Sequence, residues 1–309
     1  MKLKNALMLF CAAAIFGTTF VAQDVAGELI GFFTFNAVRC TVGCIFLIPC
    51  IVIIDCINKK NSKKKNNDAI IKVNGKITKQ LIVGGVCCGI ALFAAINLQQ
   101  LGIGYTTAGK AGFITALYIV IVPLLKIFLK QRVKLFIWIS VVLAVAGFYF
   151  LSITDGFSIE KGDLFVLLCA IVFAVHIILI DYFAPRVDGV RMSWIQFVVC
   201  AILSAICMFI FEKPDIHIIL TAWKPILYSG ICSCGIAYTL QILGQKGSDP
   251  TISSMIMSLE SVISVLAGWA ILKQALSVRE IIGCILVFVA IIIAQLPDKK
   301  KKELKNENS

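Results

Sequence analysis

The chain has 309 residues, of which 60% are hydrophobic and only 15% are charged, and its formal net charge is +12. Soluble domains contain about 45–50% apolar and about 25% charged residues, so this composition excludes an ordinary soluble domain and predicts an integral membrane protein. The basic excess does not indicate a nucleic-acid partner, because it falls in short loops and a tail that lack interleaved aromatic residues and any binding motif.

Ten stretches of the chain are each apolar over about the 20 residues that a helix needs to cross a bilayer. They are apolar throughout rather than in alternation, which favours an all-α membrane protein over a transmembrane barrel. The first stretch resembles a signal peptide, but no small-residue cleavage site follows it, so we count it as a span. The predicted spans are 5–22, 30–54, 81–103, 108–128, 135–153, 163–183, 192–211, 223–244, 251–272 and 280–296.

Most of the 29 Lys and Arg residues fall on one side of the membrane when both termini are placed in the cytoplasm. Eight lysines lie between Lys59 and Lys79, and five more lie in the tail 298–309. The outside segments then hold only Lys110, Lys161, Lys213, Lys224, Lys273 and Arg279. The positive-inside rule therefore predicts a multi-pass protein of the cytoplasmic membrane with cytoplasmic N- and C-termini. The excess of lysine over arginine, with abundant Ile and Asn, points to a bacterial source.

Thirteen cysteines lie almost entirely within the apolar spans. None has the paired spacing of a zinc site, so we expect them to behave as small hydrophobic residues. The sequence also lacks a phosphate-binding loop, a nucleophile elbow and a metalloprotease motif. We therefore predict no metal, no cofactor and no enzymatic activity.

Two short motifs occur twice at nearly the same offset. Cys-Gly-Ile-Ala stands at 88–91 and again at 234–237, an offset of 146, and Leu-Lys-Gln stands at 129–131 and again at 272–274, an offset of 143. The third and fourth spans therefore correspond to the eighth and ninth, which divides the chain into two five-helix halves. Because five is odd, the second half enters the membrane in the opposite orientation, as in the inverted repeats of transporters. The predicted boundaries are 1–155 for the first repeat, 160–297 for the second and 298–309 for a basic cytoplasmic tail.

Stretches of both halves resemble the EamA branch of the drug/metabolite transporter superfamily. They are AIFGTTFVA, NLQQLGIGYTTAGKAGFITALYIVIVPLL, DLFVLLCAIVFAVHIILIDYFA and GIAYTLQILGQKGSDPTISSMIMSLESVISVLAGWAILKQALS. The resemblance implies ten helices in two inverted repeats, with a cavity formed chiefly by helices one, three, four, six, eight and nine. It also implies export of amino acids or other small metabolites.

Two ionisable residues lie deep in predicted spans. Glu260 falls near the middle of the ninth span, where an acidic group costs about 2.5–3.5 kcal/mol on insertion scales, and its counterpart in the first half is Leu117. Glu260 is either structural, as a partner in an ion pair or as a protonated, hydrogen-bonded group, or it is a substrate or proton site. Arg39, with Asn36 one turn earlier, either pairs with Glu260, binds an anionic substrate group, or serves packing and snorkelling.

Polar residues at helical spacing give further candidates for a cavity wall. Tyr238 and Gln241, with Gln245, share one face of the eighth span, and Asn97 and Gln100 share one face of the third. Interhelical hydrogen bonds explain such stripes equally well. His176, a lone histidine in the sixth span, is either a proton carrier or a satisfied core residue. The remaining wall candidates are Tyr118, Trp269 and Thr18.

We therefore predict a secondary transporter that works by alternating access at a midplane site between the halves. Its expected partners are the lipid bilayer and a small-molecule substrate, with amino acids or similar metabolites favoured over drugs, sugars or nucleotide-type compounds. The alternatives are a membrane channel and a membrane protein without transport activity. The sequence is compatible with transport with or without proton coupling, and with a monomer or a homodimer. No span is predicted to be broken.

Overall fold

The computed structural model describes residues 1–65, 78–105, 108–131, 133, 135–152, 161–272 and 277–295. The regular structure of these residues is entirely helical. The helices are α1 (Leu3–Gly27), α2 (Phe32–Lys65), α4 (Lys79–Ile103), α5 (Ala108–Ala116), α6 (Tyr118–Phe128), α7 (Leu135–Ser152), α8 (Lys161–Phe183), α9 (Gly189–Phe211), α10 (Ile216–Thr221), α11 (Trp223–Tyr228), the π-helix η1 (Ser229–Ala237), α12 (Tyr238–Gln245), α13 (Pro250–Met257), α14 (Leu259–Leu272) and α15 (Val278–Gln295). The predicted all-α membrane fold is confirmed.

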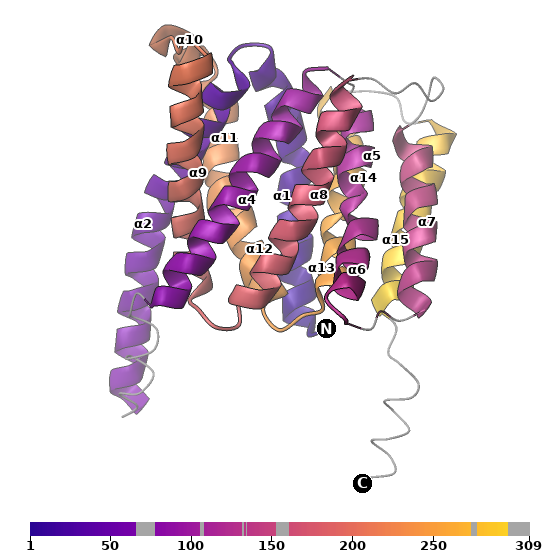
Figure 1. Ribbon diagram of the computed structural model, residues 1–309, viewed down its shortest axis with the longest axis horizontal. Helices are drawn as coiled ribbons and strands as arrows, with labels where there is room; N and C mark the ends of the chain where they lie inside the picture. Colours follow the sequence, from indigo (N-terminus) through magenta and orange to yellow (C-terminus); the bar gives the residue numbers. More distant parts are fainter. Residues whose placement is uncertain are drawn as a thin grey trace.

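Eight helical stretches within the described residues are long and apolar enough to cross a membrane, and Leu135–Phe150 is a shorter apolar helix. Three of the eight are composite: α5 and α6, then α11, η1 and α12, then α13 and α14. In Figure 1 α7 and α15 pack side by side at one edge of the bundle. The count of ten spans stays a prediction.

Equivalent helices of the two halves run in opposite directions. Figure 1 shows α5 above α6, whereas α14 lies above α13, so the fourth and ninth spans are antiparallel. Likewise α4 leads into α5 at the upper end, whereas α12 leads into α13 at the lower end. This is the inverted relation that the repeated motifs predict.

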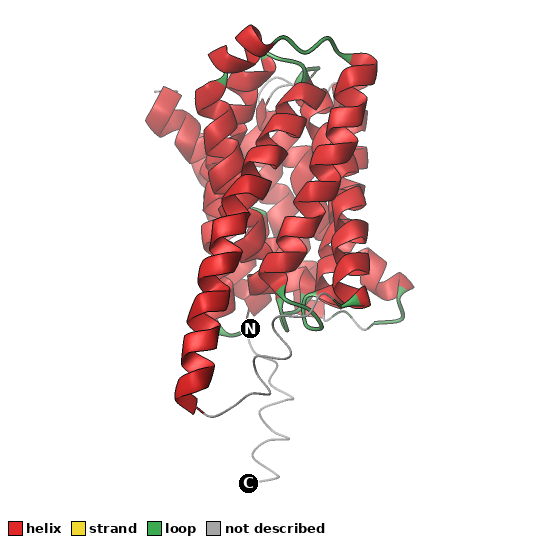
Figure 2. Cartoon of the chain, turned by 90° about the vertical axis from the view of Figure 1, so that its left-hand side faces the viewer, coloured by secondary structure: helices red, strands yellow, loops and turns green. Residues whose placement is uncertain are grey.

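The two halves are interleaved rather than separate. The first-half helix α1 packs against α12 and α14, and its counterpart α8 packs against α4, α5 and α6. The counterparts α2 and α9 also pack on each other. Figure 2 shows the helices standing close to parallel, with α2 reaching beyond the others at the end where the N-terminus lies. In lipid such contacts rely on close van der Waals packing more than on the hydrophobic effect, so small residues at the crossings stabilise the bundle.

Gly89 and Gly235, the glycines of the repeated tetrapeptide, lie at two such crossings. A Cβ added at Gly89 would lie 2.7 Å from Cβ of Val199 on α9, and one at Gly235 would collide with the ring of Phe46 on α2. Because α9 and α2 are counterparts, each glycine makes room for the same helix of the opposite half.

Two spans are interrupted by one turn residue each, although the backbone of both residues stays right-handed helical and each span continues through its turn. Leu117 separates α5 from α6, and Ser258 separates α13 from α14. At both points the backbone tightens to a bond between residues three apart, from N of Leu117 to O of Ile114 and from N of Ser261 to O of Ser258. Single turns of this kind within helices often mark functional sites.

Candidate functional site

A cavity of about 40 Å³ lies in the interior of the bundle. Its lining residues are Phe16, Thr19, Phe20, Gln23, Arg39, Gln99, Tyr118, Phe173, Ile177, Ser233, Tyr238, Gln241, Met257 and Glu260. Both halves contribute, from α1, α2, α4 and α6 in the first and from α8, η1, α12, α13 and α14 in the second. The mixture of apolar walls with a few polar groups is typical of small-molecule sites. The usual volume of such sites, about 300–1,000 Å³, is reached here only if the walls move apart.

Glu260 and Tyr118 meet where the two interrupted spans face each other. The Tyr118 hydroxyl donates a hydrogen bond of 3.1 Å to Oε1 of Glu260, and both side chains are buried. Tyr118 is the first residue of α6, and Glu260 lies in the first turn of α14. The partial positive charge at a helix N-terminus favours a carboxylate there. Gly17 allows α1 to approach this point, because a Cβ on Gly17 would lie 2.6 Å from the carbonyl oxygen of Glu260.

Arg39 faces the same cavity from α2. Its side chain is only 4% exposed, and its guanidinium stacks over the Phe35 ring, 4.8 Å from the ring centroid. Its Nε has no hydrogen-bond partner, and within the described part of the chain Arg39 forms no ion pair, with Glu260 or any other residue. Of the roles open to Arg39, pairing with Glu260 and snorkelling to the interface are therefore not what the structure shows.

Tyr238 lines the cavity from the start of α12. Its ring packs edge to face with Phe16 at 4.6 Å, Phe197 at 5.4 Å and His176 at 6.2 Å between ring centroids. The backbone N–H of Tyr238 donates to the carbonyl of Ser233, five residues earlier, which is the hydrogen bond of a π-helix. Five residues close one π turn, whereas in an α-helix they lie about 140° apart at 3.6 residues per turn. The π-helix therefore brings Ser233 and Tyr238 to the same cavity.

Five of the ten predicted site residues line this cavity: Glu260, Tyr118, Arg39, Tyr238 and Gln241. The other five lie elsewhere, although three of them are buried close by.

Asn97, Gln100 and His176 are engaged in contacts between helices. Asn97 accepts a hydrogen bond of 2.9 Å from Nδ2 of Asn36 on α2. Gln100 donates to the carbonyl of Gln23 on α1 at 3.1 Å, and His176 Nε2 lies 3.2 Å from Oε1 of Gln196 on α9. These partners correspond to the alternative reading of a hydrogen-bonded stripe or core residue.

Thr18 and Trp269 lie further from the cavity. The Thr18 hydroxyl is 2.5 Å from the hydroxyl of Tyr228 and also donates to its own helix. Trp269 is 53% exposed on the outer surface of α14, where it faces the lipid in a membrane. The polar wall residues that sequence reasoning missed are Thr19, Gln23, Gln99 and Ser233.

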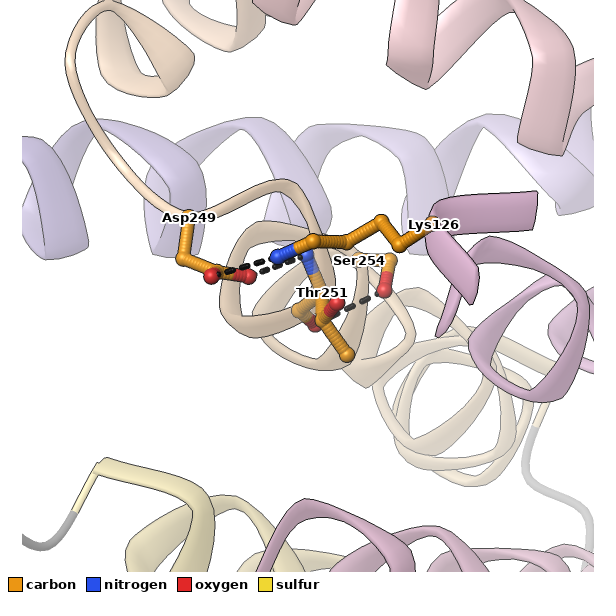
Figure 3. A network of polar contacts seen from close by, with 4 residues as sticks. All are labelled: Lys126, Asp249, Thr251 and Ser254. Carbon is orange, nitrogen blue, oxygen red and sulfur yellow. Dashed lines mark hydrogen bonds and ion pairs between the residues drawn. The ribbon is translucent and has the colours of Figure 1, made fainter. Parts of the chain in front are cut away.

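An ion pair joins the halves beyond one end of the cavity. Nζ of Lys126 at the end of α6 lies 2.6 Å from Oδ2 of Asp249, the residue that caps α13 through the N–H of Thr251 (Figure 3). Ser254, whose hydroxyl donates to the carbonyl of Thr251, completes the network. At the same end Asn5 donates to the carbonyl of Lys246. These contacts hold the fourth span against the ninth at the end where the N-terminus lies.

The cavity offers hydrogen-bonding and charged groups but no evident metal site. In the described parts of the chain, no three His, Cys, Asp or Glu side chains gather as metal ligands would. The groups that face the cavity are an arginine, a carboxyl, two phenols and several amides.

Comparisons with known proteins agree with this architecture. The EamA-like transporter family matches residues 3–153 and 160–295. An uncharacterized transporter of Archaeoglobus fulgidus is 30% identical over 296 residues, covering 94% of this chain and 85% of that protein. The uncharacterized transporter YoaV of Bacillus subtilis is 21% identical over 305 residues, covering 97% of this chain and 99% of the relative.

A crystal structure with 20% sequence identity superposes on 96% of this chain and 97% of its own, with a TM-score of 0.76. At that identity the superposition shows a shared fold. The family match covers nearly the whole chain and confirms the resemblance seen in its spans. The chain belongs to the EamA-like transporter family and is a multi-pass membrane transporter.

Proposed function

We propose that this transporter exports amino acids or other small metabolites across the cytoplasmic membrane, and that the central cavity is its substrate site. The observation that carries the proposal is the cavity itself, which takes polar and charged side chains from both halves and encloses them in apolar walls. Sparse hydrogen-bonding groups in an apolar cavity suit a small amphipathic molecule better than a large polyanion.

The proposed mechanism is alternating access between the halves 1–155 and 160–297. Inverted repeats allow each half to adopt the conformation of the other, so that a site between them opens to either side in turn. The interleaved packing of α1 with α12 and α14, and of α8 with α4 to α6, supports this mechanism because rocking one half changes both walls of the cavity.

The Lys126–Asp249 ion pair is the proposed gate at one end. It links α6 of the first half to the start of α13 in the second, and Lys126 is only 4% exposed. Opening this end separates the two spans and exposes Lys126 to water. With cytoplasmic termini, as the distribution of lysines predicts, this gate is the inner one.

The proposal is tested by overexpression in cells that are challenged with a toxic amino-acid analogue. We expect greater tolerance and a lower cellular content of the analogue than in cells that carry Glu260→Gln at the same level in the membrane. Accumulation of the analogue would show that the direction is import. If the content of amino acids is unchanged while sugars or nucleotides move, the substrate class is wrong.

A further inference from the structure

Arg39 and Glu260 are opposite charges that face one cavity without pairing with each other. We propose that Arg39 binds the carboxylate of a zwitterionic substrate and that Glu260 binds its ammonium group. This assignment rests on the proposed function and gives its substrate site a defined polarity, with the carboxylate toward α2 and the ammonium toward α14.

The guanidinium of Arg39 has hydrogen-bond donors that are not used within the described part of the protein. A guanidinium carries five N–H donors in a planar fork that matches a carboxylate. On Arg39 this group is buried and stacked on Phe35, and none of its donors has an acceptor among the described residues. Leaving a buried charge without a partner is costly, so a ligand that brings a carboxylate regains that free energy on binding.

One carboxylate oxygen of Glu260 accepts no hydrogen bond from the described residues. Oε1 is satisfied by the hydroxyl of Tyr118, whereas Oε2 has no hydrogen-bond partner among the described residues. The free oxygen belongs to a side chain that lines the cavity. An ammonium group bound there gains a charge-assisted hydrogen bond.

The two opposite charges of the cavity distinguish small molecules by the charged groups that they carry. With Arg39 cationic and Glu260 anionic the pair is formally neutral, and a bound zwitterion satisfies both groups. An amine without a carboxylate leaves Arg39 unpaired, an acid without an amine leaves Glu260 unpaired, and a sugar pairs with neither charge. Each unpaired buried charge lowers affinity, which favours the zwitterion.

The rest of the wall indicates the third part of the ligand. Phe16 and Phe20 on α1, Phe173 and Ile177 on α8 and Met257 on α13 form the apolar surface of the cavity. Such a surface suits an apolar side chain, so the zwitterion is an amino acid of the neutral, apolar kind.

The test is competition for binding of radiolabelled L-phenylalanine to the purified full-length protein in detergent. The competitors are unlabelled L-phenylalanine, 2-phenylethylamine, which lacks the carboxylate, and 3-phenylpropionate, which lacks the ammonium. A site built to bind both groups should prefer L-phenylalanine to either analogue by at least about tenfold.

Two variants assign each end of the ligand. Arg39→Gln should bind L-phenylalanine and 2-phenylethylamine equally well while still rejecting 3-phenylpropionate, and Glu260→Gln should show the reverse. Arg39→Lys keeps the positive charge and should retain part of the discrimination, which separates loss of recognition from loss of fold. Trp269→Leu, on the outer surface, is the matched control and should behave as the unmodified protein.

Three results would overturn the assignment. Equal competition by all three compounds in the unmodified protein would refute it while leaving amino-acid transport intact. Unchanged preferences in Arg39→Gln and Glu260→Gln would show that other residues read the two charged groups. Failure of L-phenylalanine, L-leucine and L-threonine to bind or be transported, with sugars or nucleotides moving instead, would refute the proposed function together with the assignment.

Discussion

The tetrapeptide Cys-Gly-Ile-Ala forms part of an ordinary α-helix at 88–91 in α4, whereas at 234–237 it closes the π-helix η1. Its glycine nevertheless has the same task in both places. Gly89 makes room for α9, and Gly235 makes room for the counterpart helix α2. The repeated tetrapeptide therefore has the same packing role in both halves, but its backbone is α-helical in the first half and π-helical in the second.

The change of backbone has a consequence for the site. Ser233 and Tyr238 reach the cavity through the π turn, whereas the residues at the matching positions, Cys87 and Leu92, do not line it. Glu260 likewise corresponds to Leu117. The scaffold is thus nearly symmetric, while the polar residues that line the cavity differ between the halves: Thr19, Gln23, Arg39, Gln99 and Tyr118 come from the first, and Ser233, Tyr238, Gln241 and Glu260 from the second. Two similar halves thus enclose one cavity with an asymmetric polar lining.

The largest effect should come from Glu260. We expect Glu260→Gln to lower the transport rate by at least about tenfold, since removing one partner of a buried charged contact costs about 2–5 kcal/mol. The matched change in the first half, Leu117→Met, conserves volume in an apolar position and should change the rate less than about twofold. Transport is measured in cells with equal amounts of each variant in the membrane. Normal transport by Glu260→Gln would reduce Glu260 to a structural role.

The two glycines should separate packing from binding. Gly89→Ala and Gly235→Ala should each destabilise the protein by about 1–3 kcal/mol, because the added methyl group overlaps a neighbouring helix. Only Gly235→Ala should also weaken binding of an amino acid, since it disturbs the π turn. Thermal unfolding in detergent and ligand binding are measured on the same samples. Equal losses of binding in the two variants would contradict a special role for η1.

The smallest effect should come from the Lys126–Asp249 gate. The Asp249 side chain is 38% exposed, so solvent screens the pair and its loss should cost roughly 1 kcal/mol or less. We therefore expect Lys126→Gln to change the transport rate about two- to fivefold, as this free energy converts. Lys130→Gln, an exposed lysine one turn later, is the control, and Lys126→Arg should restore the rate. Equal rates for Lys126→Gln and Lys130→Gln would remove the gate from the mechanism.

The sequence was sufficient to predict most of the fold. Apolar length located the spans, and the repeated motifs predicted antiparallel halves, because both signals are read directly from residue order. Near the cavity it identified Arg39, Tyr118, Tyr238, Gln241 and Glu260, since a polar group within an apolar span is costly enough to stand out.

The other features depend on three-dimensional packing. Gln99 is one residue from the polar stripe of Asn97 and Gln100, and only the rotation of α4 decides which amide faces the cavity. Ser233 reaches the cavity through a π turn. The sequence does not predict this turn, because the tetrapeptide Cys-Gly-Ile-Ala that follows Ser233 is α-helical where it occurs in α4. The interruption at Leu117 has no glycine or proline to mark it, since Pro123 lies further along within α6.

In the proposed mechanism, substrate binds in the cavity between the halves, against the π turn. Ser233→Cys, in a background without native reactive cysteines, tests it through the rate of modification by a small thiol reagent. We expect the new thiol to be modified and an amino acid that the protein transports to slow the modification, while Cys87, retained alone as its counterpart in α4, shows no such protection. Modification of Ser233→Cys at the same rate with and without that amino acid would show that the substrate does not bind against the π turn.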